Sequence, residues 1–270
     1  SMSDILTKII STKRDEISQR KKNLSLNSLE SGIKSIPEPR GFKKSLLNSI
    51  KRGTPAIIAE CKKASPSKGV ICQNYDPADI ANQYQIGGAS CISVLTDTIY
   101  FQGEDQHLVA AKRACNLPIL RKDFMIDPYQ IIESRNIGAD CILLIVACLS
   151  ISQIKELSSL SYSLGMDVLV EAHNGEELEI AMTIPDAIIG INNRDLKTFK
   201  TDINTSIELK KLVPESELLV TESGIVSSEN VKTLRENGIN SFLVGEAFMR
   251  TSQPGEALKK LFSLSPDLAI

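Results

Sequence analysis

Eight short apolar runs with strand-like composition recur along this chain, and each is followed by a polar turn and a helix-like segment. The runs begin 20 to 35 residues apart and cover residues 56–62, 91–95, 118–122, 141–146, 167–171, 187–192, 218–222 and 241–244. The helix-like segments are residues 77–87, 105–115, 128–136, 150–164, 175–183, 203–212, 227–237 and 255–262. Strict alternation of strand and helix is typical of a parallel sheet covered by its own helices.

Eight such units predict a closed parallel (β/α)8 barrel, the TIM barrel fold, for a chain of 270 residues. A doubly wound open sheet is the alternative. That fold more often carries a glycine-rich fingerprint in its first strand-to-helix turn, and this chain has none. We therefore expect an α/β barrel.

The chain ahead of the first run predicts a helical extension. Residues 5–22 carry apolar residues at helical spacing among many charges, so we expect an amphipathic helix that lies across the barrel or its mouth. Residues 23–40 contain two prolines and several serines and are predicted to be a connector, and residues 42–50 a second short helix. No linker composition interrupts the rest, so we expect one domain over 1–270, with the extension at 1–52 and the barrel at 53–270.

Charge and cysteine usage narrow the function class. With 31 Lys and Arg against 33 Asp and Glu, the net charge of -2 offers no broad attraction for nucleic acid or an anionic membrane. No apolar run is long enough to span a bilayer. The six cysteines form no C-x-x-C pair, and with two histidines and no Asp/His cluster we expect no metal. Buried, unpaired cysteines favour a reducing compartment, so we expect a cytoplasmic protein.

Polar residues stand at the carboxyl ends of five of the eight predicted strands. In a barrel these ends converge on one face, where the chemistry of such proteins takes place. A single charged strand end is ordinarily explained by a structural ion pair, but the concentration of charges and amides at one face favours an active site. The residues are Glu60 and Lys62, Lys122, Glu171, Asn192 and Arg194, and Glu222 and Ser223.

The first of these strand ends is the most unusual. Glu60 and Lys62 are two residues apart, so their side chains should point the same way, while Cys61 should point toward the helices. The following Ser-Pro-Ser-Lys-Gly segment, residues 65–69, is predicted to be a flexible loop over the substrate. Lys68 in this loop could contact an anion or face solvent.

Two glycines predict a phosphate site. Gly224 and Gly245 follow the seventh and eighth strands, ahead of helical segments, where backbone N–H groups can approach a ligand. Phosphate sites in barrels are frequently built there, although each glycine alone could simply make a tight turn. For His107 and His173 we expect a surface or supporting role rather than catalysis.

Several stretches together resemble the indole-3-glycerol phosphate synthase family. They are IAECKKASPSKG (58–69), SVLTD (93–97), YFQG (100–103), PILRKDFMIDPYQ (118–130), DVLVEAH (167–173), IGINNRDL (189–196), VTESGI (220–225) and FLVGEAFM (242–249). The resemblance spans nearly the whole predicted barrel, and the order of its motifs is specific. Cys61 stands where the family commonly has an aliphatic residue, and no effect on the chemistry is expected from its predicted outward direction.

The resemblance implies a carboxy-lyase of tryptophan biosynthesis that acts without a cofactor. Its reaction converts 1-(2-carboxyphenylamino)-1-deoxyribulose 5-phosphate to indole-3-glycerol phosphate, carbon dioxide and water, which requires general acids and a base. By resemblance, Lys122 is the general acid for ring closure and Glu171 a general acid or base in the later steps. Lys62 would pair with the substrate carboxylate, and either Lys62 or Lys122 could supply the acid for dehydration.

The resemblance also implies roles for the other matching positions. Glu60 would orient the lysines and contact the substrate, and Glu222 would meet the ribulose hydroxyls. Asn192 and Arg194 would position the anthranilate end. The implied substrate-binding residues are Ser65, Ser223, Gly224 and Gly245 for the phosphate, Phe101 and Phe124 for the aromatic ring, and Leu243 and Glu246.

Two other functions are alternatives to this one. Phosphoribosylanthranilate isomerase is also a barrel that binds an anthranilate-ribose phosphate, but it should use a Cys and Asp pair, where this chain presents Lys and Glu. A catalytically silent scaffold should have lost its polar strand ends, and here they are present. We expect a small phosphorylated substrate as the partner, no nucleic acid or membrane, and a monomer or weak homodimer.

Overall fold

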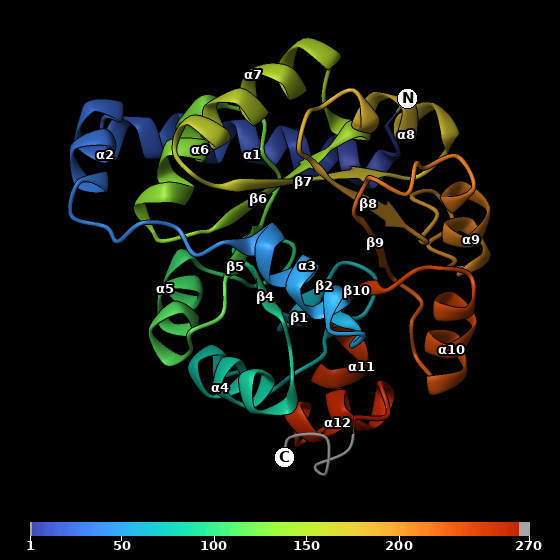
Figure 1. The fold of residues 1–270 in the computed structure, drawn as a ribbon. Helices are drawn as coiled ribbons and strands as arrows, with labels where there is room; N and C mark the ends of the chain where they lie inside the picture. Colours follow the sequence, from blue (N-terminus) through green and yellow to red (C-terminus); the bar gives the residue numbers. More distant parts are fainter. Residues whose placement is uncertain (1, 265–270) are drawn as a thin grey trace.

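Eight parallel strands close into a barrel in the computed structural model, which describes residues 2–264 (Figure 1). The barrel order is β1-β10-β9-β8-β7-β6-β5-β4, so each strand pairs with its neighbour in the chain and β1 closes on β10. The strands are β1 (Ala56–Cys61), β4 (Cys91–Leu95), β5 (Ile119–Lys122), β6 (Cys141–Ile145), β7 (Asp167–Ala172), β8 (Ile188–Asn192), β9 (Leu219–Glu222) and β10 (Ser241–Val244). The predicted barrel is confirmed, and the open-sheet alternative is wrong.

Helices follow the strands and pack on the outside of the barrel. They are α4 (Pro77–Gly87), α5 (Asp105–Ala114), α6 (Pro128–Asn136), α7 (Ile151–Ser163), α8 (Gly175–Met182), α9 (Asn204–Lys210), α10 (Ser228–Glu236) and α12 (Pro254–Leu261). Two short helices, η1 (Val146–Cys148) and α11 (Glu246–Met249), add to them. Local sequence fixes several starts, because Asp127, Ser150 and Ser227 each form a capping box with the third helical residue.

The extension contains three helices, where two were predicted. α1 (Asp4–Asn23) and α3 (Phe42–Lys51) agree with the sequence, but α2 (Leu26–Ile33) lies in the stretch predicted to be a connector. Ser25 caps α2 by accepting a hydrogen bond from the backbone N–H of Ser28. Leu29 packs with Tyr129 and Ile132 of α6. The serines of this stretch are therefore caps and surface residues of a helix. Of the predicted ranges for extension and barrel, residue 1 and residues 265–270 lie outside the described residues.

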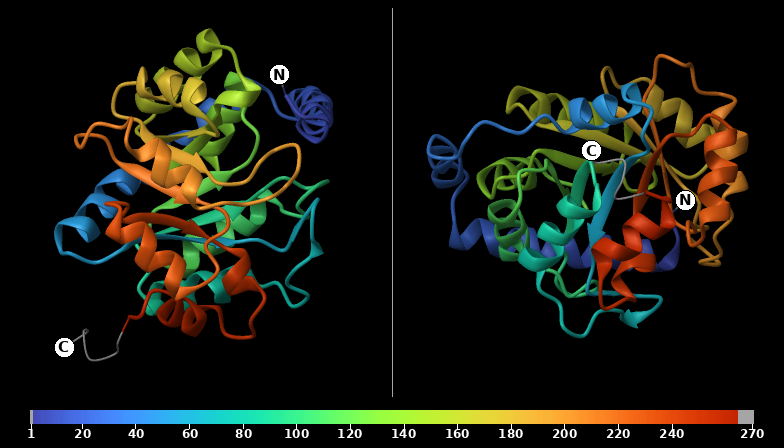
Figure 2. Two further views of the ribbon diagram at one scale, coloured as in Figure 1. Left: turned by 90° about the vertical axis from the view of Figure 1, so that its right-hand side faces the viewer. Right: turned by 60° about the horizontal axis from the view of Figure 1, so that its bottom comes forward.

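The extension covers both ends of the barrel. Figure 2 shows α1 in dark blue and α3 in light blue on opposite sides of the strands. α3 fully buries Phe42 and Leu46 in the interior cluster, against Ala56 and Cys91 at the amino ends of β1 and β4. α1 lies at the other end, where Ile5 lines the pocket formed by the carboxyl ends of the strands. The expectation that this helix crosses the mouth is confirmed.

The alternation of side chains along β1 decides which residues face the interior. Ala56 and Ile58 belong to the cluster inside the barrel, whereas Ile57 and Cys61 pack between the strands and the helices. Glu60 therefore points inward at the carboxyl end. The prediction that Cys61 faces the helices is confirmed.

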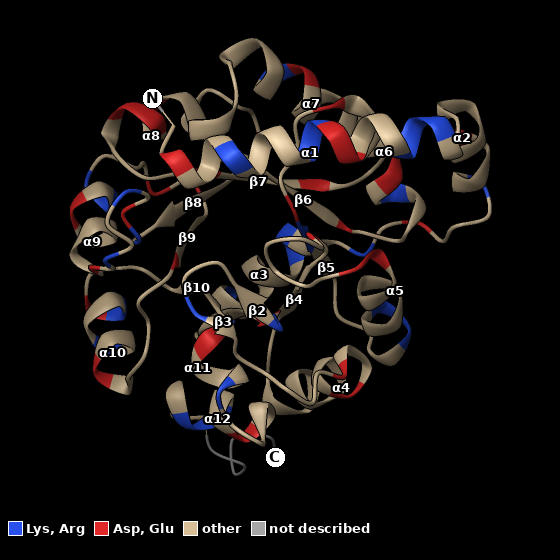
Figure 3. Ribbon diagram, turned by 180° about the vertical axis from the view of Figure 1, so that it is seen from behind, with Lys and Arg blue, Asp and Glu red and all other residues tan. Residues whose placement is uncertain are grey.

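A buried lysine fastens α1 to the barrel. Lys13 Nζ lies 2.7 Å from Asp97 Oδ1 and 2.9 Å from Asp123 Oδ1, in the loops after β4 and β5. All three side chains are at most 4% exposed. Burial acts to lower the pKa of Lys13, but the Asp123 and Asp97 carboxylates outweigh burial and raise it. Figure 3 shows α1 crossing the barrel on this side, with its charges of both signs.

Lys13→Met should lower the free energy of unfolding by about 3 to 5 kcal/mol, because two buried carboxylates lose their cation. Urea unfolding at neutral pH measures the change. Lys8→Met, on the exposed side of the same helix, is the matched control and should change stability by less than about 0.5 kcal/mol. Equal effects of the two substitutions would contradict the anchoring role of Lys13.

Candidate active site

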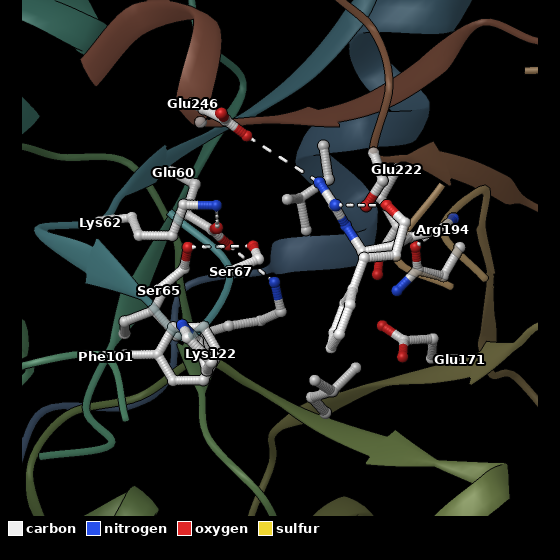
Figure 4. Close-up of a pocket in the computed structure, with 18 of the residues that line it drawn as sticks. Glu60, Lys62, Ser65, Ser67, Phe101, Lys122, Glu171, Arg194, Glu222 and Glu246 are labelled. Carbon is white, nitrogen blue, oxygen red and sulfur yellow. Dashed lines mark hydrogen bonds and ion pairs between the residues drawn. The ribbon is translucent and has the colours of Figure 1, made fainter. Parts of the chain in front are cut away.

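A pocket at the carboxyl ends of the strands brings together every residue that the sequence predicted for a site (Figure 4). These residues come from β1, β5, β7, β8, β9 and β10 and the loops that follow β1, β4, β5, β8, β9 and β10. They are Glu60, Lys62, Ser65, Phe101, Lys122, Phe124, Glu171, Asn192, Arg194, Glu222, Ser223, Gly224, Leu243, Gly245 and Glu246.

Strand alternation places the charged groups in this pocket. On β5, Leu120 belongs to the interior cluster and Lys122 follows two residues later. The same two-residue spacing separates Leu169 from Glu171 on β7 and Val220 from Glu222 on β9, and Leu169 and Val220 also belong to the interior cluster. On each of these three strands an apolar inward residue is thus followed, at the carboxyl end, by a charged inward residue.

Glu60 is the centre of the ionic contacts on one side of the pocket. Its Oε2 lies 2.9 Å from Lys122 Nζ and accepts a 2.8 Å hydrogen bond from Ser93 Oγ, while its Oε1 lies 3.8 Å from Lys62 Nζ. Burial alone would raise the pKa of Glu60, but the Lys122 and Lys62 ammonium groups hold it below its ordinary value. Glu60 is therefore an ionised anchor between two lysines.

The two lysines differ in their electrostatic surroundings. Burial acts to lower the pKa of Lys122, but the carboxylates of Glu60, Glu222 and Glu171 raise it above its ordinary value. For Lys62 burial prevails over the attraction of Glu60, and its pKa is lowered. Lys122 is thus held as an ammonium ion, and Lys62 releases its proton more readily.

Glu171 and Glu222 face the lysines from the other side of the pocket (Figure 4). Burial and the neighbouring Glu171 carboxylate raise the pKa of Glu222 well above its ordinary value, against the opposing effect of Lys122. Glu222 Oε2 has no hydrogen-bond partner within residues 2–264. Glu222 therefore holds its proton to a higher pH than an ordinary glutamate, and its Oε2 is available to a ligand.

Arg194 stands at the rim, held by its own loop. Its backbone N–H donates to Asn192 Oδ1 at 3.0 Å, and its Nη1 donates to the Phe199 carbonyl at 2.9 Å. Its Nη2 lies 3.9 Å from Glu246 Oε2. Much of the guanidinium thus remains free to contact an anion in the pocket.

The turns after β9 and β10 have geometry suited to an anion. Ser223 and Gly224 both have positive φ, 73° and 76°, which is unusual for a serine. A Cβ on Gly224 would lie 2.8 Å from Thr201 Cβ, and one on Gly245 would lie 2.8 Å from Glu60 Cβ. Close packing therefore leaves no room for a side chain at either glycine.

The loop after β1 contains a small hairpin that the sequence did not predict. β2 (Ala64–Ser65) pairs antiparallel with β3 (Gly69–Val70), and Ser65 Oγ accepts a hydrogen bond from the backbone N–H of Lys68 at 3.2 Å. Ser65, Pro66 and Ser67 line the pocket, whereas Lys68 is exposed. The flexibility of this loop stays a prediction.

Aromatic and aliphatic side chains form the apolar wall of the pocket. The rings of Phe101 and Phe124 lie with centroids 6.0 Å apart. Sequence reasoning missed other lining residues, which are Ile5, Leu6 and Ile9 of α1, Leu95, Leu143 and Ile145 of the strands, and Leu196 and Phe199 of the β8 loop. The apolar stripe of α1 was a signal for its residues, but nothing local showed which surface that stripe covers.

The two histidines differ in their relation to this pocket. His107, on α5, lies against the ring of Tyr75 and does not line the pocket. His173 follows β7, and its Nε2 lies 3.5 Å from Glu171 Oε2. The prediction of a supporting position for His173 agrees with this contact.

The described residues show neither a metal site nor a membrane-spanning helix. No group of three or more His, Cys, Asp or Glu side chains there is arranged to hold a metal ion. Within residues 2–264, every helix is too short or too polar to cross a bilayer.

Known structures share this fold at low sequence identity. N-acetylmannosamine-6-phosphate 2-epimerase from Clostridium perfringens is 18% identical, with a TM-score of 0.56, over 76% of this chain and 90% of that one. Thiamine phosphate pyrophosphorylase from Pyrococcus furiosus is 12% identical, with a TM-score of 0.58, over 78% of this chain and 95% of that one. At such identities the likeness concerns the barrel alone.

A family comparison is far more specific. The model of the family described as indole-3-glycerol phosphate synthase matches residues 6–261. The match includes α3 and all eight barrel strands and begins within α1. The chain therefore belongs to the indole-3-glycerol phosphate synthase family, a family of carboxy-lyases of tryptophan biosynthesis.

Proposed function

We propose that the pocket carries out the family's reaction with Lys122 and Glu171 as its principal acid and base. The reaction closes an indole ring on 1-(2-carboxyphenylamino)-1-deoxyribulose 5-phosphate and releases carbon dioxide and water. The observation that carries the proposal is the position of Lys122. Its ammonium is held by Glu60 at 2.9 Å, and the carboxylates of Glu171 and Glu222 contribute to its raised pKa.

Ring closure needs a cation at the substrate ketone. The Lys122 ammonium can donate a hydrogen bond and then a proton to the developing alkoxide. The apolar surroundings favour this proton transfer. Glu171 then removes a proton as the indole double bond forms. The lowered pKa of Lys62 makes it the better proton donor for the departing hydroxyl.

We propose that the two sides of the pocket bind the two anionic ends of the substrate, one side the carboxylate and the other the phosphate. Lys62, Asn192 and Arg194 would hold the carboxylate end, with Phe101 and Phe124 against the ring. Ser65, Ser223, Gly224 and Gly245 would hold the phosphate, with Leu243 and Glu246 as further contacts. The positive φ values at Ser223 and Gly224 support an anion site there.

A second barrel function, phosphoribosylanthranilate isomerase, finds less support. That activity would use a cysteine and an aspartate, and the pocket lining within the described residues contains Asp123 but no cysteine. Asp123 is moreover paired with Lys13 at 2.9 Å.

We also propose that the enzyme is cytoplasmic, that it consists of one domain, and that it acts as a monomer or weak homodimer.

The purified protein should form a product with indole fluorescence from the carboxyphenylamino ribulose phosphate in the presence of a chelator. Lys122→Met and Glu171→Gln should each lower kcat by at least about a hundredfold, because each removes a proton-transfer group. His107→Gln, outside the pocket, is the control and should keep its activity. No product at substrate saturation would refute the function, and near-normal kcat in both variants would refute the assigned roles.

Gly224→Ala should raise KM and weaken competitive inhibition by inorganic phosphate, because a Cβ would push on Thr201 and move the backbone N–H groups. Gly53→Ala is the matched control. Gly53 also has a positive φ, 81°, but an added Cβ meets nothing within 4 Å. Both substitutions carry the same backbone strain, so an equal KM for the two variants would argue against the phosphate site.

Glu222→Gln should stabilise the protein relative to the wild type progressively as pH rises above the unfolded pKa of a glutamate, near 4.3. An ordinary unfolded Glu releases its proton near pH 4.3, while the buried Glu222 keeps its proton to higher pH. The folded state then binds more protons, and the wild-type stability falls by up to about 1.4 kcal/mol per pH unit in that window. Glutamine has no proton to release and escapes this loss.

Urea unfolding of the wild type and of Glu222→Gln at several pH values measures the difference. Glu215→Gln, at a side chain 94% exposed, is the control, because water reaches that carboxyl in both states. A constant difference between Glu222→Gln and the wild type would show that the pKa of Glu222 is not raised.

A further inference from the structure

His173 connects Glu171 to a second carboxylate outside the pocket. His173 Nδ1 lies 3.0 Å from Oε1 of Glu177 on α8, and the backbone N–H of His173 donates to the same oxygen at 3.0 Å. On the other side of the ring, Nε2 lies 3.5 Å from Glu171 Oε2. The imidazole thus lies between two carboxylates of different elements.

The contact with Glu177 assigns the tautomer of the ring. An ionised carboxylate only accepts hydrogen bonds, so Nδ1 carries a hydrogen and donates it to Glu177. In the neutral ring Nε2 is then an acceptor, and this atom is buried with no hydrogen-bond partner among the described residues. Two acceptors, Nε2 and Glu171 Oε2, consequently face each other in a buried place.

An extra proton would resolve this contact. Carried by Nε2, it makes an imidazolium that donates to Glu171; carried by Glu171, it makes a carboxylic acid that donates to Nε2. Either state replaces a repulsive contact between lone pairs with a hydrogen bond. The pair is therefore built to hold one proton and to pass it from one side to the other.

The reaction itself leaves a proton on Glu171. The substrate enters as a carboxylate; ring closure gives one proton to the ketone oxygen, and the hydroxyl takes a second when it leaves as water. Carbon dioxide leaves its bonding electron pair on the ring, and one proton is lost as the indole double bond forms. Each turnover thus takes two protons from the lysines, which recover them from solvent, and gives one to Glu171, which must release it before the next turnover.

We propose that His173 is a positioning and proton-relay residue, which carries the proton that Glu171 takes from the substrate out to the Glu177 side and so returns Glu171 to its ionised form. The exposed fraction of the side chains rises along this route, from 5% for Glu171 to 9% for His173 and 18% for Glu177. At the inner end, Glu171 lines the pocket. The relay rests on the proposed role of Glu171.

Other groups around the ring do not offer a competing route. Asn174 Nδ2 lies 3.4 Å from Oε2 of Glu177. This amide nitrogen is a hydrogen-bond donor, so it cannot accept the proton. Cys148 of η1 lies near both carboxylates, and burial and those charges raise the pKa of its thiol. The thiol therefore stays protonated, and Glu171, Glu177 and the imidazole remain the groups that exchange a proton.

His173→Gln separates a relay from a structural role. The amide can still hydrogen-bond to Glu171, but it cannot take up and release a proton. We expect kcat to fall by at least about tenfold with KM within about twofold, and added imidazole to restore the rate in a saturable way. His107→Gln is the matched control and should neither lose activity nor respond to imidazole.

A near-normal kcat for His173→Gln would overturn the relay, and so would a loss that imidazole does not restore. Should His173→Gln fail to fold, as judged by urea unfolding, Glu177→Gln is measured in its place. Its kcat should fall with KM unchanged, and an unaltered kcat would likewise overturn the relay. Glu171→Gln tests the proposed role of Glu171 separately, so failures of the two proposals are distinguishable.

Discussion

The two-residue period of a strand inside a closed barrel is the constraint on which the pocket depends. Ala56 and Ile58 fill the barrel interior, so the next inward position of β1, Glu60, must face the same space at the end that opens. The same rule puts Lys122 and Glu171 there. The layers below offer few polar partners, so these charged groups interact chiefly with one another, and otherwise with Ser93 and His173.

The buried charged groups of the pocket shift one another's pKa values, and these shifts affect which group can donate or accept a proton. A buried ion pair contributes little net stability, since desolvation opposes the attraction, but it separates the proton affinities of its members. Glu60 stays ionised beside two lysines, whereas Glu222, beside another carboxylate, holds its proton to a higher pH. The pocket thus places an ammonium ion near two glutamates whose pKa values are shifted in opposite directions, which isolated side chains in water could not provide.

Sequence patterns predict what is local and periodic in this protein. The eight barrel strands and the eight predicted helices lie within two residues of their predicted bounds, and the spacing of Glu60 and Lys62 predicts that they point the same way. The short helices η1 and α11 were not predicted. Contacts between distant residues could not be predicted in this way. The sequence around His173 does not indicate that Glu171 and Glu177 flank its ring. The helix α2 was not predicted, because the serines that cap it and lie on its surface are also typical of a connector.

The docking of α1 is the clearest case of a distant contact with a functional consequence. Lys13 reaches Asp123, the residue after Lys122, so the helix is fastened to the loop that directly follows the strand carrying the principal acid. α1 also places Ile5, Leu6 and Ile9 in the pocket lining. By excluding water, these side chains lower the local dielectric and strengthen the attraction between Lys122 and its carboxylates. The electrostatics of the barrel therefore depend on a helix outside it.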